Sequence, residues 1–451
     1  MDHGSVIAAK KRIVILGGGF AGAYTASYLE KHFAGSPDVE VLLLSKENFV
    51  LFTPMLHEVA GSDLSVTDIV QPLRRMLPHT RILIAEVKAI DLVKKEVRVF
   101  HEDSGRTFEV AYDQVVLAVG AVTNFYRTPG LEEHALTMKT LGDAILARNR
   151  AIELLGLADN IADETLRKDV LTVVVAGGGF AGVETAGAVN DLMRETMKFY
   201  PSLKKEMLRI VIVDPGKVLL PELSESLGRY AEEHLRRRGV EVRLKTKVNG
   251  YDGKEVSLSD GTRIAARTLI WTAGITPPPL LSSLPCHIER GRVVANDRLQ
   301  VPNWPGVWAL GDCALVPDPL NPGKYYPPTA QHAIRQAAVA ASNIASALRG
   351  EALRPFEFKT LGLLATIGRR TGVAEILGVR FSGIIAWWLW RGIYLGKLPG
   401  LQKKVRVAID WTLDLIFSKD IVELPTLRSP TISADEESAP GTTGEPQIEV
   451  G

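Results

Sequence analysis

The apolar residues of this chain gather in short runs separated by segments of helical spacing. Residues 11–16 (KRIVIL) and 39–44 (VEVLLL) are apolar-rich runs, and 21–33 (AGAYTASYLEKHF) between them has apolar positions at helical spacing. Such runs are typical of buried strands, and strand, helix, strand is the order of a parallel βαβ unit. Residues 170–214 repeat the order with VLTVVVA, a helix opening at AGVETAGAVNDL, and LRIVIVD. The pattern predicts an α/β fold with two Rossmann-like dinucleotide-binding units.

The first strand of each unit leads into the same six residues, GGGFAG, at 17–22 and again at 177–182. In a GxGxxG turn the glycines allow a tight turn, close approach of the backbone to a pyrophosphate, and close helix–strand packing. The helix N-terminus then faces the phosphates. One such turn can be a packing feature that binds nothing, but two copies in matching units favour two nucleotide sites. The predicted contacts are Gly17, Gly19, Phe20, Ala21 and Gly22 in the first site, and Gly177, Gly179, Phe180, Ala181 and Gly182 in the second.

The end of each unit's second strand distinguishes the two sites. Asp214 is suited to accept hydrogen bonds from a ribose 2′-hydroxyl and would repel a 2′-phosphate, so it favours NADH over NADPH. Its alternative role is that of a turn residue before Pro215. The first unit has Ser45 where an acid is expected, followed by Lys46. Serine can still hydrogen-bond a ribose, and both residues are predicted contacts of the first site.

Composition narrows the class of protein without defining its chemistry. At 451 residues, two or three domains are expected, and 46% apolar and 23% charged residues are typical of a globular protein. The 53 basic and 52 acidic residues give no support to a nucleic-acid partner. The two cysteines, Cys286 and Cys313, exclude a disulfide framework and fit a reducing compartment. No metal site is predicted.

The segment at 381–396, FSGIIAWWLWRGIYLG, is too short and, with Arg391 inside it, too charged to span a bilayer. Basic residues follow, and 407–417 (VAIDWTLDLIF) resumes an apolar helical pattern. Tryptophan and tyrosine favour the headgroup level of a membrane, and lysines attract anionic lipid. The alternative is a helix packed on the core or on a second subunit. Residues 426–451 are rich in Ser, Pro, Gly and acid, which is typical of a disordered tail.

The ordered motifs resemble the two-dinucleotide-domain flavoproteins, in which the first turn holds FAD and the second NAD(P)H. The stretch VWALGDCA (307–314) resembles their second FAD motif, which implies that Asp312 contacts the flavin nucleotide. Two apolar strands ending in small-residue turns, YDQVVLAVG and ARTLIWTAG, add Ala118 and Gly120 to the FAD site and Ala273 and Gly274 to the NADH site. The resemblance implies a discontinuous FAD domain (10–125 and 290–348), an inserted NADH domain (126–289), and a C-terminal membrane-anchoring or dimerisation region (349–425).

Three further stretches resemble the type II NADH dehydrogenases, which are non-pumping NADH:quinone oxidoreductases. NFVLFTPMLHEVAGS resembles their segment near the flavin and quinone and implies FAD contacts at Thr53 and Pro54. GVETAG implies that Glu184 lies at the nicotinamide–flavin junction, although a first-turn charge is the simpler alternative. The third stretch lies at residues 327–336.

PPTAQHAIRQ (327–336) resembles the quinone-site motif AQxAxQ of the same family. Ala330, Gln331 and Ala333 match it, and the first two are also expected to contact FAD. Arg335 takes the place of the second glutamine, and Gln336 comes one residue late. The alternative for Gln331 is a capping or packing role in an alanine-rich helix.

The resemblance therefore implies a peripheral enzyme on the cytoplasmic face of the cell membrane, and a homodimer, that oxidises NADH through FAD and reduces quinone. Glu184 would position nicotinamide or quinone and relay a proton, with quinone reduced near Gln331. Because no cysteine precedes Cys286, a flavin-linked disulfide reductase is excluded and a sulfide:quinone oxidoreductase is disfavoured. A soluble NADH-dependent reductase with a ferredoxin-type acceptor, and a flavin-bound redox sensor, stay open as alternatives.

Overall fold

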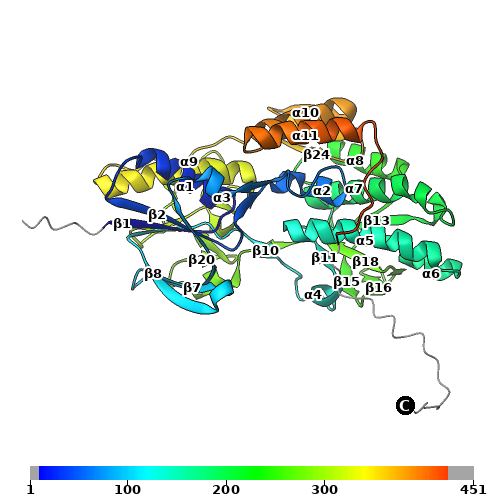
Figure 1. Cartoon of the computed structure of the whole chain (residues 1–451), viewed down its shortest axis with the longest axis horizontal. Helices are drawn as coiled ribbons and strands as arrows, with labels where there is room; N and C mark the ends of the chain where they lie inside the picture. The colour runs from blue at the N-terminus through cyan, green and yellow to red at the C-terminus, as the bar shows by residue number, and fades with distance from the viewer. Residues whose placement is uncertain (1–9, 425–451) are drawn as a thin grey trace, which may run out of the picture.

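The first structural unit is a parallel five-stranded sheet in the order β22-β9-β1-β2-β5. The computed structural model describes residues 10–424, so the tail expected at 426–451 lies outside the described residues. The strands are β1 (Lys11–Leu16), β2 (Val39–Ser45), β5 (Arg81–Ile84), β9 (Gln114–Leu117) and β22 (Val307–Ala309). Helices α1 (Phe20–His32) and α9 (Ala330–Arg349) pack together on this sheet (Figure 1). Since β22 returns after the whole second unit, the first sheet is assembled from two separate parts of the chain.

The second unit is another parallel five-stranded sheet, in the order β11-β18-β12-β13-β14. Its strands are β11 (Leu136–Thr137), β12 (Thr172–Ala176), β13 (Arg209–Val213), β14 (Val240–Arg243) and β18 (Thr268–Trp271). Its main helices are α5 (Leu141–Asn160), α7 (Phe180–Thr196) and α8 (Glu225–Arg237). The chain crosses between the units twice, at β10 (Val122–Thr123) and β19 (Ile275–Thr276), which pair antiparallel.

Smaller elements complete the two units. One antiparallel ribbon has two strands, β3 (Phe49–Leu51) and β4 (Val70–Pro72). Two others have three strands each: β6 (Glu86–Asp91), β7 (Glu96–His101) and β8 (Arg106–Ala111), and β15 (Val248–Tyr251), β16 (Glu255–Leu258) and β17 (Arg263–Ala265). In the last, β20 (Ile288–Glu289) pairs antiparallel with β21 (Arg292–Val294), and β23 (Ala314–Leu315) runs parallel to β21. The short helices are α2 (Leu56–Ala60), α3 (Leu73–Met76), α4 (Leu131–His134) and α6 (Glu164–Val170).

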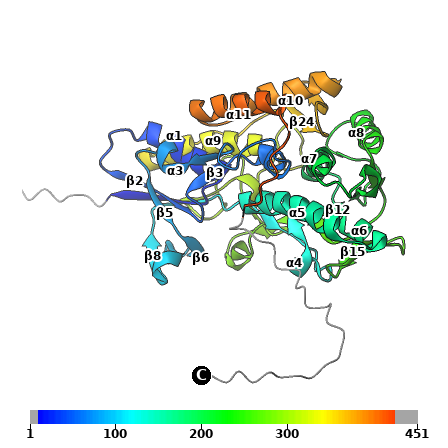
Figure 2. The same cartoon turned by 45° about the vertical axis from the view of Figure 1, so that its right-hand side comes forward.

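The C-terminal region begins with a three-stranded antiparallel sheet that the sequence analysis did not predict. It consists of β24 (Gly362–Thr366), β25 (Gly372–Ile376) and β26 (Val379–Ser382). The two expected helices follow as α10 (Gly383–Lys397) and α11 (Leu401–Asp414), which lie side by side above both units (Figures 1 and 2). Within residues 10–424, no helix combines the length and the apolar character needed to cross a membrane.

The C-terminal region shares a hydrophobic core with the two nucleotide-binding units. One core fills the first unit. A second core joins α5 and α7 of the second unit to α10 and α11, and it also includes Phe52, Met55, Leu56 and Val59 from the first 125 residues. The segment that carries α2 is therefore clamped between the second unit and the C-terminal region. Burial of these side chains, at about 25 cal/mol per Å² of apolar area, fixes the three parts against one another.

Candidate active site

The first glycine turn lies where β1 ends and α1 begins. Gly17 has φ +107°, and a Cβ there would lie 2.3 Å from the carbonyl oxygen of Ala118. A Cβ on Gly22 would lie 1.9 Å from the carbonyl oxygen of Gly17. On Gly19, by contrast, a Cβ would meet no atom of the described residues within 4 Å. The turn is closed on its protein side and open above a helix N-terminus, which is the shape a pyrophosphate requires.

The second glycine turn reproduces this geometry between β12 and α7. Gly177 has φ +117°, and a Cβ there would lie 2.6 Å from Thr272 Oγ1. A Cβ on Gly182 would lie 1.8 Å from the carbonyl oxygen of Gly177, while Gly179 faces open space within the described part of the chain. The helices begin with the predicted Phe20, Ala21 and Gly22, and with Phe180, Ala181 and Gly182.

The remaining predicted nucleotide contacts gather at the same edges of the two sheets, because the carboxyl ends of parallel strands share one edge. Ala118 and Gly120 follow β9, Asp312 lies in the turn after β22, and Asp312 Oδ2 is 3.7 Å from Lys139 Nζ. Thr53 and Pro54 form a single 3₁₀ turn before α2. Ala273 and Gly274 follow β18 beside the second turn. Each unit therefore has an open cradle that fits the pyrophosphate of a dinucleotide, with its predicted neighbours beside it.

Ser45 and Asp214 occupy equivalent places beneath the two turns. The Ser45 side chain is buried, and its hydroxyl donates a 2.7 Å hydrogen bond to the Glu47 carbonyl. Its neighbour Lys46 pairs with Glu86 at the surface. The Asp214 carboxylate accepts two 2.6 Å hydrogen bonds, from the backbone N–H groups of Gly178 and Gly216. Asp214 thus holds its own glycine turn in place, in addition to any contact with a ribose.

Glu184 lies deeper in its helix than the sequence suggested. Because α7 begins at Phe180, Glu184 is in the second turn, and the interpretation as a first-turn charge is wrong. Its side chain is buried, and burial raises its pKa well above 4.5. One carboxyl oxygen accepts a 3.2 Å hydrogen bond from the Thr366 backbone N–H. The other lies 3.4 Å from His57 Nδ1.

His57 completes a contact between all three parts of the molecule. Its Nε2 lies 2.9 Å from Thr366 Oγ1, and burial together with the nearby Lys419 lowers its pKa to about 3, so the imidazole is neutral. His57 comes from α2, Glu184 from α7 and Thr366 from β24. The stretch that contains His57 resembles a family segment without implying a role for His57, and no sequence motif includes Thr366. The only sequence signal was an ionisable pair, His57 and Glu58, within an apolar helix.

Gln331 and Glu184 both hydrogen-bond to strand β24, but at opposite ends of it. The cap of α9 is Thr329, whose hydroxyl accepts the His332 backbone N–H, so the capping alternative for Gln331 is wrong. Gln331 instead donates a 3.3 Å hydrogen bond to the carbonyl of Gly362, the first residue of β24. Four strand steps separate Gly362 from Thr366, or about 13 Å at 3.3 Å per residue. The two residues predicted to be catalytic therefore lie at opposite ends of one strand.

Gln336, which comes one residue late in the quinone motif, holds the turn that carries Asp312. Gln336 is buried, and its side-chain oxygen accepts a 2.8 Å hydrogen bond from the Gly311 N–H, in the turn that carries Asp312. Arg335, which stands where the second glutamine is expected, lies 4.2 Å from the centre of the Phe358 ring. Cys313 is buried and its pKa is raised to about 11, so its thiol is not reactive.

The tryptophan segment has one buried side and one exposed side, so both a packing role and a membrane-contact role are compatible with its structure. Trp387 and Trp390 are buried, whereas Trp388 is 57% exposed. Exposed apolar side chains continue along α10, α11 and the residues that follow: Ile384, Ile385, Trp388, Leu401, Val405, Ile409, Leu413, Ile416 and Phe417. One side of these helices therefore packs on the protein core, and the other presents an apolar face, hereafter the outer face.

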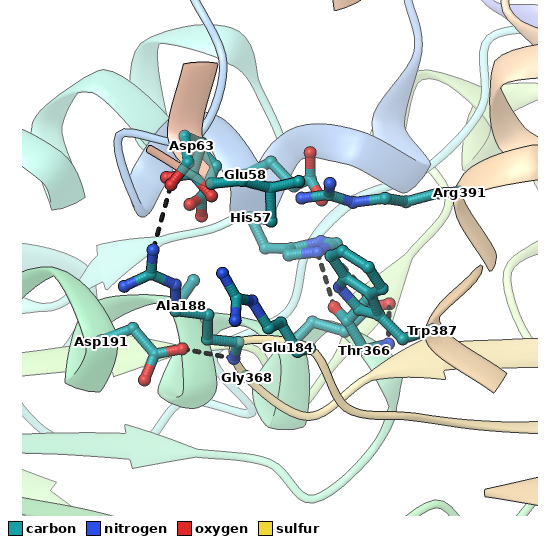
Figure 3. Close-up of a pocket in the computed structure, with 14 residues that line it drawn as sticks. His57, Glu58, Asp63, Glu184, Ala188, Asp191, Thr366, Gly368, Trp387 and Arg391 are labelled. Carbon is teal, nitrogen blue, oxygen red and sulfur yellow. Dashed lines mark hydrogen bonds and ion pairs between the residues drawn. The ribbon is translucent and has the colours of Figure 1, made fainter. Parts of the chain in front are cut away.

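A small charged cavity lies beneath α10 and α11, next to Glu184 (Figure 3). Acidic and basic residues from α2, α7, α10 and α11 line it together with the turn before β25. Arg391 packs its guanidinium 3.9 Å from the centre of the Trp387 ring and 4.7 Å from that of Trp411. Glu184 is thus bordered by ionisable groups that the C-terminal region largely covers.

Two parallel-sheet units, each with an open pyrophosphate cradle, define the class of two-nucleotide oxidoreductases. The family model for pyridine nucleotide-disulphide oxidoreductases matches residues 11–337, and that for the NDH2 C-terminal domain matches 361–420. The type II NADH:quinone oxidoreductase Ndh of Mycobacterium tuberculosis is 32% identical over 91% of this chain and 89% of its own length. The demethylphylloquinone reductase NdbB of Synechocystis is 31% identical over 89% of this chain and 96% of its own length.

A solved structure of NDH2 from Plasmodium falciparum in complex with NADH has the same fold, with a TM-score of 0.83 at 20% identity, over 92% of this chain and 100% of that one. The chain therefore belongs to the pyridine nucleotide-disulphide oxidoreductases and, within them, to the type II NADH:quinone oxidoreductases.

Proposed function

We propose that this protein is an NADH:quinone oxidoreductase that uses FAD and works at a membrane surface. Oxidation of NADH with reduction of a quinone follows from the relatives that match nearly the whole chain. The observation that carries the proposal is the junction of Glu184, His57 and Thr366, because it joins both nucleotide units to the C-terminal region.

Bound FAD supplies the two-electron carrier between NADH and quinone. The residues of the chain supply binding and position. The first glycine turn and Asp312 hold the flavin nucleotide, and the second turn and Asp214 hold NADH through its pyrophosphate and ribose. The two pyrophosphate sites are supported by the closed geometry of each turn and by the open space above Gly19 and Gly179. The choice of FAD for the first and NADH for the second is supported by the residues beside each turn, Asp312 and Asp214.

The overall reaction takes up one proton from water: NADH, H⁺ and quinone give NAD⁺ and quinol. Glu184 is the group best placed to deliver that proton, since its raised pKa keeps the carboxyl group protonated above the usual range. Gln331, at the far end of β24, is the proposed hydrogen-bond donor to the quinone. The prediction that no protons are pumped stays a prediction.

The outer face is the proposed membrane contact. It combines the exposed apolar residues of α10 and α11 with the exposed Arg406, whose charge suits an interface with anionic headgroups. A soluble ferredoxin-type reductase has no use for such a face, so this feature favours a quinone that resides in lipid. Attachment to the cytoplasmic face and a homodimer stay predictions.

Stopped-flow kinetics with lipid vesicles test the proposal. NADH should bleach the flavin of the wild-type protein, and quinone in anionic vesicles should restore its colour. A variant with Ile385→Ser, Trp388→Ser and Ile409→Ser should keep NADH bleaching but lose vesicle binding and reoxidation by vesicle-bound quinone. The control carries Val93→Ser and Phe108→Ser, which are exposed apolar residues of the ribbon formed by β6, β7 and β8. Bleaching without reoxidation in the wild type would favour a redox sensor instead.

A further inference from the structure

The charged cavity beside Glu184 has room for water. Its volume is about 30 Å³, and a single water needs about 10–15 Å³ of such space. The Nε atoms of Arg369 and Arg391, two of the lining residues, have no hydrogen-bond partner among the described residues although they are buried. Buried polar atoms of this kind are normally satisfied by ordered water. Shape and unpaired donors therefore both indicate a hydrated cavity.

The cavity runs from the buried junction towards solvent. At its inner end the side chains of His57, Glu58 and Glu184 are buried. At its other end Asp414 and Leu415 are half-buried and Arg370 is exposed. Figure 3 shows Glu58, His57, Glu184 and Arg391 directed towards the same space. A proton from solvent could thus reach Glu184 without passing through the apolar core.

Glu58 is the inner group of this cavity whose role is unassigned. One carboxyl oxygen accepts a 2.5 Å hydrogen bond from Trp411 Nε1. Burial and the nearby Asp63 raise its pKa to about 8, against the opposing effects of Arg391, Trp411 and Lys419. At neutral pH it therefore carries a proton and can exchange it within the physiological range.

Charged groups face Glu58 and its cavity from every element packed around it. They are His57 on its own helix, Asp63 and its ion-pair partner Lys419, Glu184 and Asp191 from α7, Arg369 and Arg370 before β25, Arg391 from α10, and Asp414 from α11. Burial also raises the pKa of Asp414, at the outer end, to about 6. Of these two acids, Glu58 and Asp414, the inner one therefore has the higher proton affinity.

We propose that Glu58 stores the solution proton of each turnover and passes it through the hydrated cavity to Glu184. This inference rests on the proposed function, because it supplies the second proton of quinol. The O–H bond of Glu184 breaks as one forms on the quinone oxygen, Glu58 then reprotonates Glu184, and solvent reprotonates Glu58 past Asp414. Electrons come only from NADH. Glu58 touches neither substrate and acts through Glu184, while neutral His57 orients the Glu184 carboxyl group.

The test variant is Glu58→Gln, which keeps the size of the side chain and an acceptor for Trp411. NADH bleaching of the flavin should be unchanged, and quinone-driven reoxidation at pH 7 should slow about tenfold. The wild-type reoxidation rate should stay level up to about pH 8, whereas the variant's should fall with each unit of pH across the neutral range. Glu58→Asp should restore part of the level region. Glu153→Gln, at a half-exposed surface position, is the control.

Infrared difference spectroscopy gives a readout that does not depend on turnover. The C=O stretch of a buried protonated carboxyl group should titrate near pH 8 and disappear in Glu58→Gln. An unchanged pH profile together with an unchanged infrared band would overturn the inference. Failure of the wild type to reduce quinone would overturn the proposed function instead.

Trp411→Phe is a second test variant, to be used if Glu58→Gln does not fold. It removes the hydrogen bond that favours the ionised form of Glu58, so the fall in rate should move to higher pH. An unshifted profile in a folded, flavin-loaded Trp411→Phe protein would also contradict the inference.

Discussion

The two GGGFAG turns are the same six residues in nearly the same backbone conformation, yet their surroundings differ. The residue before each helix, Gly19 or Gly179, has φ near −75° and ψ beyond −165°. Beneath the first turn lies Ser45, whose hydroxyl is committed to a carbonyl, and beneath the second lies the charged Asp214. The turn thus has the shape of a pyrophosphate cradle in both units, and we expect the neighbouring residue to distinguish one nucleotide from the other.

The helices that follow the two turns differ as well. α1 packs on the alanine-rich α9, and the position that corresponds to Glu184 is Tyr24. α7 packs on α2, α5 and β24, and these contacts bury Glu184. One helix therefore serves mainly to hold its nucleotide, and the other also carries an ionisable group into the junction.

The largest expected effect comes from filling the open side of each turn. Gly19→Val should abolish FAD binding, whereas Gly179→Val should keep FAD and raise the KM for NADH about 100-fold, since two charge-assisted hydrogen bonds are lost. A Cβ at either position meets no described atom within 4 Å, so the first atom of the new side chain enters open space. Flavin absorbance and steady-state kinetics measure both. If each variant impaired the other nucleotide, the assignment of the turns would be reversed.

The next effect concerns the residues beneath the turns. Asp214→Ser gives the second site the residue found in the first, and NADH affinity should fall about tenfold through loss of ribose hydrogen bonds. The preference for NADH over NADPH should fall too, because the repelling charge is gone. Ratios of kcat/KM for the two nucleotides measure this, with flavin content as the control. An unchanged ratio would leave Asp214 with only its contacts to Gly178 and Gly216.

A smaller effect should separate the two helices through the pH dependence of stability. Since the Glu184 pKa is raised on folding, its favourable contribution is complete below pH 4.5 and is lost as pH rises towards the folded value. Glu184→Gln should therefore gain at least about 2 °C in Tm relative to wild type between pH 5 and 8. The matched control, Tyr24→Phe in α1, should show no such trend, because Tyr24 ionises above pH 10. Parallel trends in both variants would contradict the comparison.

The smallest effect is expected at Ser45. Ser45→Ala removes one neutral hydrogen bond to Glu47 and should cost at most about 1.5 kcal/mol of stability. FAD content should be unchanged, as measured by flavin absorbance after gel filtration. Loss of FAD would instead make Ser45 a nucleotide ligand.

Local patterns predicted the two βαβ units, the two turns and the paired helices at the C-terminus. They did not predict β24–β26, because GLLAT and GVAEI are short glycine-bounded runs whose partners lie elsewhere in the chain. They also missed Thr366 and the role of His57, whose contact joins positions 309 residues apart. No periodicity within a segment reports a contact of that range.

The sequence by itself determined where strands, helices and glycine turns form, since these depend on neighbouring residues and on backbone geometry that only glycine permits. Tertiary structure alone decided which ionisable side chains lose water. Glu58, His57 and Glu184 are residue types that are usually exposed, but packing of α2, α7, α10 and α11 buries them. Burial is the largest cause of their shifted pKa values. The same packing gave the C-terminal region a second place, as part of the site, beside the anchoring role that the sequence predicts.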